Sequence, residues 1–436
     1  MTTAIRKLLA VAAFVGLLWP AAAGAADVGN VAVIEDNGSI ITTVGLAHMI
    51  DLKEAGKAFF IGHHDEFDFL TVLASGGVGM VTTPIHAEPA RIPAEGIGAT
   101  PLYGTPSDYG SAGRLLSAAF IGSLGMYPED PGTFLAVIPH EIGHAWLGKI
   151  RYDLGDGQGP RKDLLGESTW HWSFYFDSGS SVMYGNTLTD NGNGTFTLSG
   201  SSNREYGPLD QYLMGLRPAA EVPPFFVGVP DPSEPFTPDQ SPLAAGGTKT
   251  VKGAVRRVTV ADVIKAEGPR APSYGDAQCH FRNAFILVVS KGASATGAEI
   301  AKLDGLRTGW QEFFASATGG RGSIDTTLDG RFSPGTCEGG ADAGATDRGR
   351  DAETDASTDA GTADGSADAE TDTRAAEETT DTGTDAEIGD TGGDAGTTDD
   401  VVVPSTDADG RGPDTSAESE NAGGCSCSVL SLRGIR

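Results

Sequence analysis

The sequence is poor in positive charge. Its 436 residues include 30 Lys and Arg against 59 Asp and Glu, which gives a net charge of −29. Residues 338–424 contain 25 acidic residues, four arginines and no lysine, so they carry −21 of this charge and leave −8 for the rest. A nucleic-acid-binding protein presents a basic face to phosphate. No basic stretch of that kind is present, and we expect no nucleic-acid partner.

Long hydrophobic runs are also missing. The longest lies at the N-terminus, where Arg6 and Lys7 precede an apolar run from Leu8 to Trp19 and small residues continue to Ala26. The run is shorter than the roughly 20 residues that a membrane-spanning helix needs. It has the three parts of a signal peptide, which we assign to residues 1–26. We therefore predict export and a secreted or cell-surface location.

Aromatic residues are absent from residues 338–424, and cysteine is scarce throughout, with four residues in the chain. An acidic segment without apolar bulk cannot offset its chain entropy, so we predict a disordered linker there. An oxidising compartment permits disulfides, and we expect one between Cys279 and Cys337. Cys425 and Cys427 follow the linker, in a short end segment of residues 425–436.

The remaining 311 or so residues predict an α+β fold. We assign 27–218 to a catalytic domain built on a twisted sheet, and 219–337 to a smaller supporting subdomain. In the first, Ala58–Ile61 and Phe67–Leu73 have strand character, and Gly113–Leu124 has helical spacing. In the second, strand- and helix-like runs are expected at Thr248–Val258, Ala284–Val289 and Ala298–Phe314.

A second helix in the first domain is indicated by Asp130-Pro131, a cap residue followed by proline. Apolar residues then recur every four positions, at Phe134, Ile138, Ile142 and Trp146, and form one buried stripe. His140 and His144 share a different side of this helix. Pro139 lacks a backbone donor, so the helix is expected either to bend there or to begin late.

His140-Glu141-Ile142-Gly143-His144 carries the chemistry that we predict. Two imidazoles at positions i and i+4 reach one zinc ion. Glu141 lies about 100° round the helix from His140, where it can act as a general base on water attacking a peptide carbonyl. The pattern therefore predicts a Zn²⁺-dependent peptidase acting on protein or peptide substrates.

The motif resembles the zincin signature, and residues further on are similar to the metzincins. Ser180–Gly185 resembles the Met-turn, in which Met183 would form an apolar floor beneath the zinc. A helix from Pro208 to Gly215 after that turn is similar to the arrangement in the immune-inhibitor-A-like metalloproteases, a secreted bacterial group. The resemblance covers residues 140–218 and implies a zincin-like catalytic domain.

One departure concerns the third zinc ligand. Metzincins place a glycine and a ligand where this chain has Leu147 and Ile150, so the ligand must come from elsewhere. We predict His171, with Asp210 as the next candidate and Glu167 as the third, because catalytic zinc keeps three protein ligands.

Two further candidates have ordinary structural alternatives. Tyr184 is predicted to stabilise the oxyanion, although metzincins that use such a tyrosine place it one residue further on, and a packed turn residue is the alternative. The segment His63-His64-Asp65 is a possible second metal cluster, but a polar turn explains it better.

The end of the chain resembles a myxobacterial sorting signal, because Gly423–Cys427 follows an acidic spacer and Cys425 would be the anchoring point. The family's apolar span is missing, and only Ser428–Arg436 follows, so surface attachment and release both stay open. We expect a monomeric secreted zinc endopeptidase, and the alternative is a non-catalytic surface binding or adhesion module on the same fold.

Overall fold

A computed structural model describes residues 25–99, 102–128, 131–166, 170–179, 181–201, 205–330, 332 and 334–337. The predicted signal peptide up to residue 24, the acidic linker and the end segment lie outside the described residues. The structure has 24% helix and 30% strand, which agrees with the α+β class. None of the described helices is both long and apolar enough to cross a membrane.

The larger sheet has the strand order β1-β2-β13-β5-β7-β6, and β14 also pairs with β13. Strands β2, β13, β5 and β7 run parallel, while β1 and β6 are antiparallel edge strands. The strands of this sheet are β1 Ala26–Val28, β2 Val31–Glu35, β5 Phe69–Ala74, β6 His86–Pro89, β7 Ser117–Ser123, β13 His280–Val289 and β14 Ser323–Asp325.

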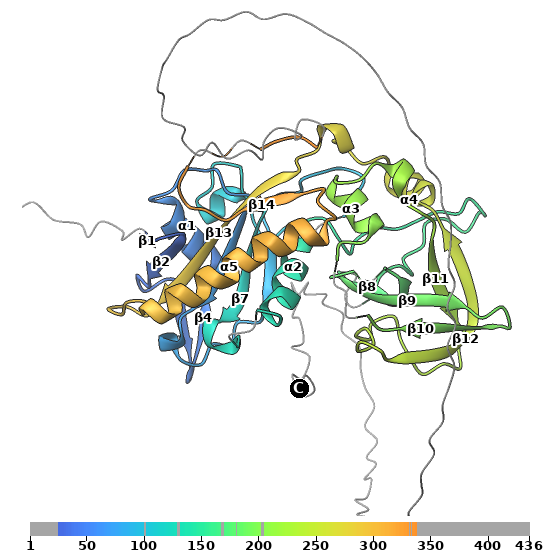
Figure 1. Cartoon of the computed structure of the whole chain (residues 1–436), viewed down its shortest axis with the longest axis horizontal. Coiled ribbons are helices and arrows are strands. Elements are labelled where there is room, and N and C mark those ends of the chain that lie inside the picture. The colour runs from blue at the N-terminus through green and yellow to red at the C-terminus, as the bar shows by residue number, and fades with distance from the viewer. Residues whose placement is uncertain are drawn as a thin grey trace, which may run out of the picture. The chain divides into compact units, whose positions relative to one another are not determined.

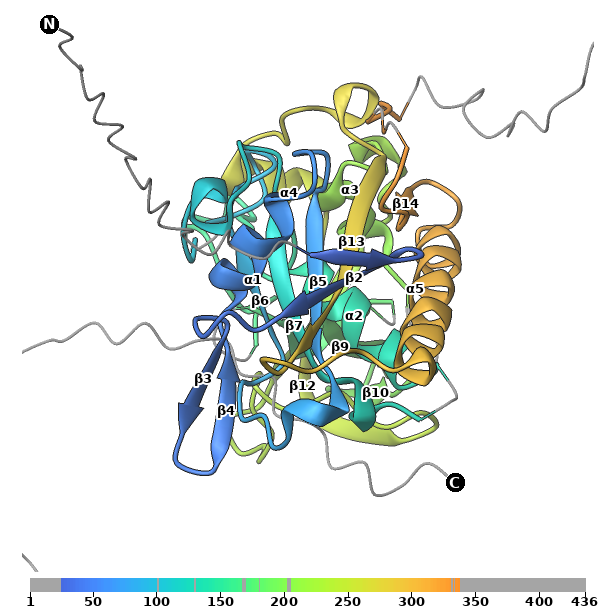
Figure 2. The ribbon, with the colours of Figure 1, turned by 90° about the vertical axis from the view of Figure 1, so that its left-hand side faces the viewer.

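Helices cover both faces of the sheet (Figures 1 and 2). Helix α1, Leu52–Phe60, packs its buried side chains into one apolar cluster with β5 and β7. Helices α2, Phe134–Gly143, and α5, Gly297–Ala317, bury theirs in a second cluster on the opposite face. Central strands enclosed in this way have apolar residues on both faces, which explains the continuous burial of β5 and most of β13.

A closed five-stranded barrel follows α2 in the sequence, with the order β10-β12-β11-β8-β9. In Figure 1 it lies on the opposite side of α2 and α3 from α5. Its strands are β8 Trp172–Asp177, β9 Tyr184–Asp190, β10 Thr195–Ser199, β11 Phe225–Pro230 and β12 Thr248–Val258. The other elements are α3 Pro208–Met214, α4 Val260–Glu267 and a hairpin of β3 Ile41–Val44 and β4 Ala47–Ile50.

Two predicted elements are wrong. Ala58–Ile61 is not a strand, because it holds the last three residues of α1 and its C-cap, Ile61. The helix begins after Asp51, whose side chain caps the amides of Lys53 and Glu54. Gly113–Leu124 is not a helix, because its second half forms β7. That strand is buried on both faces, so its apolar residues are not restricted to alternate positions and their spacing imitates a helix.

The boundary predicted at residue 218 does not divide the sheet. Strand β13, from the segment 219–337, lies between β2 and β5 of the segment 27–218. The three strand- and helix-like runs of the second part are regular elements: Thr248–Val258 is β12, Ala284–Val289 is part of β13 and Ala298–Phe314 is part of α5.

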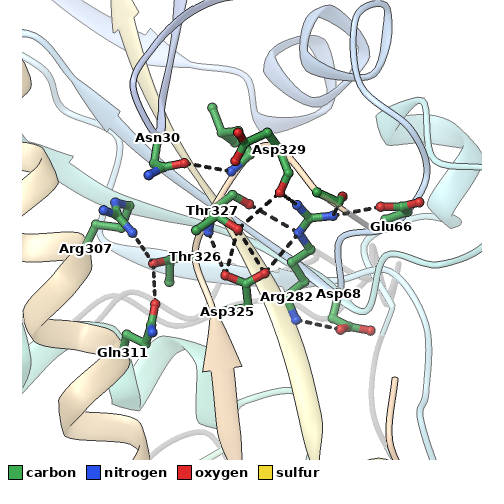
Figure 3. A network of polar contacts seen from close by, with 12 residues as sticks. Asn30, Glu66, Asp68, Arg282, Arg307, Gln311, Asp325, Thr326, Thr327 and Asp329 are labelled. Atoms are coloured by element: carbon green, nitrogen blue, oxygen red, sulfur yellow. Dashed lines mark hydrogen bonds and ion pairs between the residues drawn. The ribbon is translucent and has the colours of Figure 1, made fainter. Parts of the chain in front are cut away.

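Polar contacts hold β13 against β14 and the loop after it (Figure 3). The Arg282 side chain is 1% exposed; it pairs with Glu66 at 2.7 Å and Asp325 at 3.5 Å, and donates to the Asp329 carbonyl at 2.7 Å. Nearby, Cys279 and Cys337 form the expected disulfide, with their Cα atoms 5.1 Å apart. The central strand is therefore tied to the end of the described chain.

Candidate metal centre

The predicted histidine motif lies on α2, and the apolar stripe of this segment is buried. The four stripe residues Phe134, Ile138, Ile142 and Trp146 are each at most 1% exposed, as predicted. The predicted cap Asp130 lies outside the described residues, and α2 itself begins at Phe134. Pro139 lies inside α2 without ending it, and its carbonyl accepts a hydrogen bond from the Tyr206 hydroxyl at 2.8 Å.

Three buried histidines meet beside this helix. His140, His144 and His171 are 4%, 2% and 1% exposed, and their potential ligand atoms all lie within 4.8 Å of one another. The Nε2 atoms of His140 and His171 are 3.0 Å apart. Two nitrogens bound to one tetrahedral zinc at 2.1 Å would be about 3.4 Å apart. The cluster is therefore close to the size that a zinc ion requires.

His171 reaches α2 because the chain closes tightly around Gly148. This residue has φ +76°, and a Cβ atom there would collide with the carbonyl of Trp170. His171 directly precedes β8, and its carbonyl accepts the amide of Gly166 at 2.9 Å. A residue without a side chain at position 148 thus lets the loop pass close to the end of α2.

The hydrogen bonds suit metal binding. His140 Nδ1 lies 2.8 Å from the carbonyl oxygen of Val182, so it carries the proton and leaves the lone pair of Nε2 for a metal. Neither ring nitrogen of His144 has a hydrogen-bond partner among the described residues. A buried polar group is normally satisfied, and a metal ion would satisfy this one.

Electrostatics keep His144 in the form that binds metal. Its pKa is well below the usual 6.5, first because of burial and then because of the nearby His140, His171 and Lys149. A neutral imidazole is the ligand form. Glu141, the predicted general base, is 1% exposed on the same helix.

The predicted Met-turn lies directly beneath α2, although Ser180 is outside the described residues. The amide of Tyr184 donates to the carbonyl of Ser181 at 3.2 Å, and Met183 is 0% exposed. A Cβ atom on Gly143 would lie 2.8 Å from the sulfur of Met183. The methionine therefore fills the space under the helix between His140 and His144.

Tyr184 lies against the histidines. Its ring centroid is 4.8 Å from those of both His140 and His171. Its backbone has φ +79°, the one positive value outside glycine among the described residues. Such a conformation is sparsely populated in non-glycine residues and persists only where surrounding structure enforces it.

Asp210 does not join the histidine group, and it acts as a structural acceptor instead. It lies in α3, where Oδ1 accepts from Trp172 Nε1 and Oδ2 accepts from the amide of Gly207, both at 2.9 Å. Burial raises the pKa of Asp210 to about 6. Because Trp172 follows His171, this carboxylate orients the residue next to a candidate ligand. The third candidate, Glu167, lies outside the described residues.

His63-His64-Asp65 does not form a metal site. His63 contacts the Phe59 carbonyl at 2.8 Å and Asp27 at 3.1 Å, while Asp65 accepts from Ser111 at 2.5 Å. Within the described ranges, His140, His144 and His171 form the one group of three potential ligands.

Sequence reasoning missed Gly148 and Lys149, which close α2 onto the His171 loop. Lys149 is 6% exposed; its Nζ donates to the His144 carbonyl and lies 5.3 Å from the Trp170 ring centroid. Neither residue carries a local signal for this contact, because Gly148 lies five residues beyond the last residue of α2.

Comparison of the chain with protein-family models, with curated proteins and with solved structures finds no match. The function must therefore be inferred from the chemistry of the three histidines and Glu141.

Proposed function

We propose that this protein is an exported zinc-dependent endopeptidase with a zincin-like catalytic domain. The observation that carries the proposal is the convergence of His140, His144 and His171, all buried, beside a helix that also bears Glu141. No fourth His, Cys, Asp or Glu of the described residues joins this group. Three protein ligands favour a catalytic zinc over a structural one, which uses four.

Each residue of the site has a distinct task in this proposal. The three histidines hold the ion, which when bound would polarise the scissile carbonyl and the attacking water. The carboxylate of Glu141 accepts the proton of that water and passes it to the leaving amine. Tyr184, whose ring contacts two of the histidines, would donate its hydroxyl to the oxyanion.

The direct test compares Glu141→Gln with the wild-type chain and with Glu312→Gln, a matched change at an exposed position in α5. We expect wild type and both variants to bind one zinc per chain, and Glu141→Gln to cleave a denatured protein substrate about 10²- to 10⁴-fold more slowly. Retained activity in Glu141→Gln, or no zinc in the wild type, would contradict the proposal.

The second candidate function is a surface binding or adhesion module that holds the metal without turnover. It predicts zinc binding with equal, background cleavage by wild type and Glu141→Gln. Export, a monomeric state and attachment through Cys425 stay predictions from the sequence alone.

A further inference from the structure

A cavity of about 190 Å³ lies beside Trp146, three residues beyond the end of α2. Its apolar lining includes Trp146, Leu116, Met214 and Phe281, all at most 2% exposed. None of the residues that line the cavity is a histidine or belongs to α2 itself. The space would hold several water molecules, each of which takes about 30 Å³ in the liquid.

Two arginines also line this cavity, Arg91 and Arg270, and neither forms an ion pair with any described residue. Arg270 is 9% exposed, and its guanidinium donates to the carbonyls of Leu213 at 2.9 Å, Met214 at 3.1 Å and Pro272. Burial without a carboxylate lowers the pKa of Arg270 to about 10. Buried charges normally have a counter-charge, so this one lacks its usual compensation.

Arg91 has an unused donor. Its Nη2 donates to the carbonyl of Arg114 at 3.2 Å, but its Nε is buried and has no hydrogen-bond partner among the described residues. The nearby carboxylate of Asp68 attracts Arg91 electrostatically but forms its ion pair with Arg114, at 2.8 Å. Its Oδ2 accepts from Gln278 and from the amide of Arg282, both at 2.9 Å, and its Oδ1 has no hydrogen-bond partner among the described residues.

The lining carries a net positive charge. Asp276 contributes the one carboxylate; it is exposed, and it accepts a hydrogen bond from the Ser273 hydroxyl at 2.9 Å. Two guanidiniums and one carboxylate together favour a single negative charge over a multiply charged anion. The apolar walls add a preference for a ligand with a hydrophobic group.

We propose that this cavity is a binding site for a small organic monocarboxylate, whose carboxylate pairs with Arg91 and Arg270 while its apolar group contacts Trp146. A carboxylate accepting from guanidinium groups forms charge-assisted hydrogen bonds, which are about twice as strong as neutral ones. The site is separate from the histidine cluster, and the proposal does not depend on the peptidase activity.

The test uses isothermal titration calorimetry on the full chain with 3-phenylpropionate as the probe. Its neutral analogue 3-phenylpropanamide and inorganic phosphate are the comparison ligands. Each titration is done with metal removed by a chelator, so that carboxylate binding to zinc does not contribute, and is then repeated with zinc. We expect saturable 1:1 binding of 3-phenylpropionate in both states and at least tenfold weaker binding of the amide and of phosphate.

Arg91→Met keeps the apolar stem of the side chain and removes the charge, and Arg257→Met at an exposed position of β12 is the matched control. We expect Arg91→Met to weaken binding of the probe at least tenfold and Arg257→Met to leave it unchanged. Arg91 is preferred over Arg270, whose bonds to the end of α3 also support folding. A peptide ending in a free phenylalanine carboxylate, titrated without metal, shows whether a chain end binds as well as a free acid.

Four outcomes would overturn the proposal. Equal binding of the amide would show an apolar cavity without charge recognition, and equal binding of phosphate would show simple anion attraction. Unchanged binding by Arg91→Met, or no binding of the probe at all, would show that these arginines do not form a carboxylate site.

Discussion

Gly143 is the position at which one added methyl group tests whether Met183 supports the proposed metal centre. The change is Gly143→Ala. Its Cβ would lie 2.8 Å from the Met183 sulfur and 3.5 Å from Leu147 Cδ1. Met183 is 0% exposed, so it has no solvent-filled space into which it could move.

The size of the effect follows from two opposing terms. Replacing glycine by alanine inside a helix stabilises by about 1 kcal/mol. Overpacking a buried site costs about 1 to 3 kcal/mol. We therefore expect Gly143→Ala to lower the free energy of unfolding by about 0 to 2 kcal/mol. The displaced helix would carry His140 and His144 together away from His171, so zinc affinity should fall about tenfold or more.

Gly305→Ala in α5 is the matched control, because nothing lies within 4 Å of a Cβ at that position. We expect it to stabilise the chain by about 0.4 to 1 kcal/mol and to leave zinc affinity unchanged. The difference between the two variants then measures the overpacking alone. Urea unfolding of the metal-free chain gives the stabilities, and competition with a chromophoric chelator gives the zinc affinities.

A double variant adds a second check. Met183→Ala alone should destabilise by about 2 to 5 kcal/mol. Combined with Gly143→Ala, the loss should be smaller than the sum of the two single losses by about 0.5 to 3 kcal/mol, because the new methyl group occupies the vacated space. If Gly143→Ala stabilised as much as Gly305→Ala, the packing of Met183 beneath α2 would be refuted.

Two further predictions follow. Gly148→Ala should lower both stability and zinc affinity, because its φ of +76° and the nearby Trp170 carbonyl leave no room for a side chain; zinc affinity equal to wild type would contradict the role given to this turn. The metal-free chain should lose stability as the pH falls below about 6.5, because His144 is protonated in the unfolded chain but stays neutral in the folded one. This difference in proton binding lowers the free energy of unfolding by up to about 1.4 kcal/mol per pH unit. Urea unfolding at several pH values measures this slope, which should be shallower in His144→Gln, and an equal slope in that variant would contradict the prediction.

The helices near the site are predictable from sequence because their signals are local. The four-residue spacing of Phe134, Ile138, Ile142 and Trp146 gives the buried face of α2. Pro208 and Gly215 bound α3, and Gly215 takes the left-handed conformation expected after a helix. The grouping of His171 with His140 and His144 agrees with the preferred ligand set, although no local pattern distinguishes His171 from Asp210.

Other features depend on distant partners and leave no local signal. The hydrogen bond from Trp172 to Asp210 makes that carboxylate a structural acceptor, and the two residues are 38 positions apart. Nothing within 280–289 indicates that this segment pairs with Val31–Glu35 and Phe69–Ala74. A buried parallel strand is simply apolar, so its neighbours cannot be deduced from its pattern.

The position of β13 imposes an order on biosynthesis. Ribosomes make β2, β5 and α2 first, yet the strand that joins β2 to β5 comes more than 130 residues after the histidine motif. Until that strand emerges, the inner edges of both neighbours are open, and α2 lacks part of its packing, including the contact of Phe134 with Phe285 at 6.2 Å between ring centroids. A nascent or prematurely terminated chain therefore contains every proposed zinc ligand while the scaffold that aligns them is still incomplete.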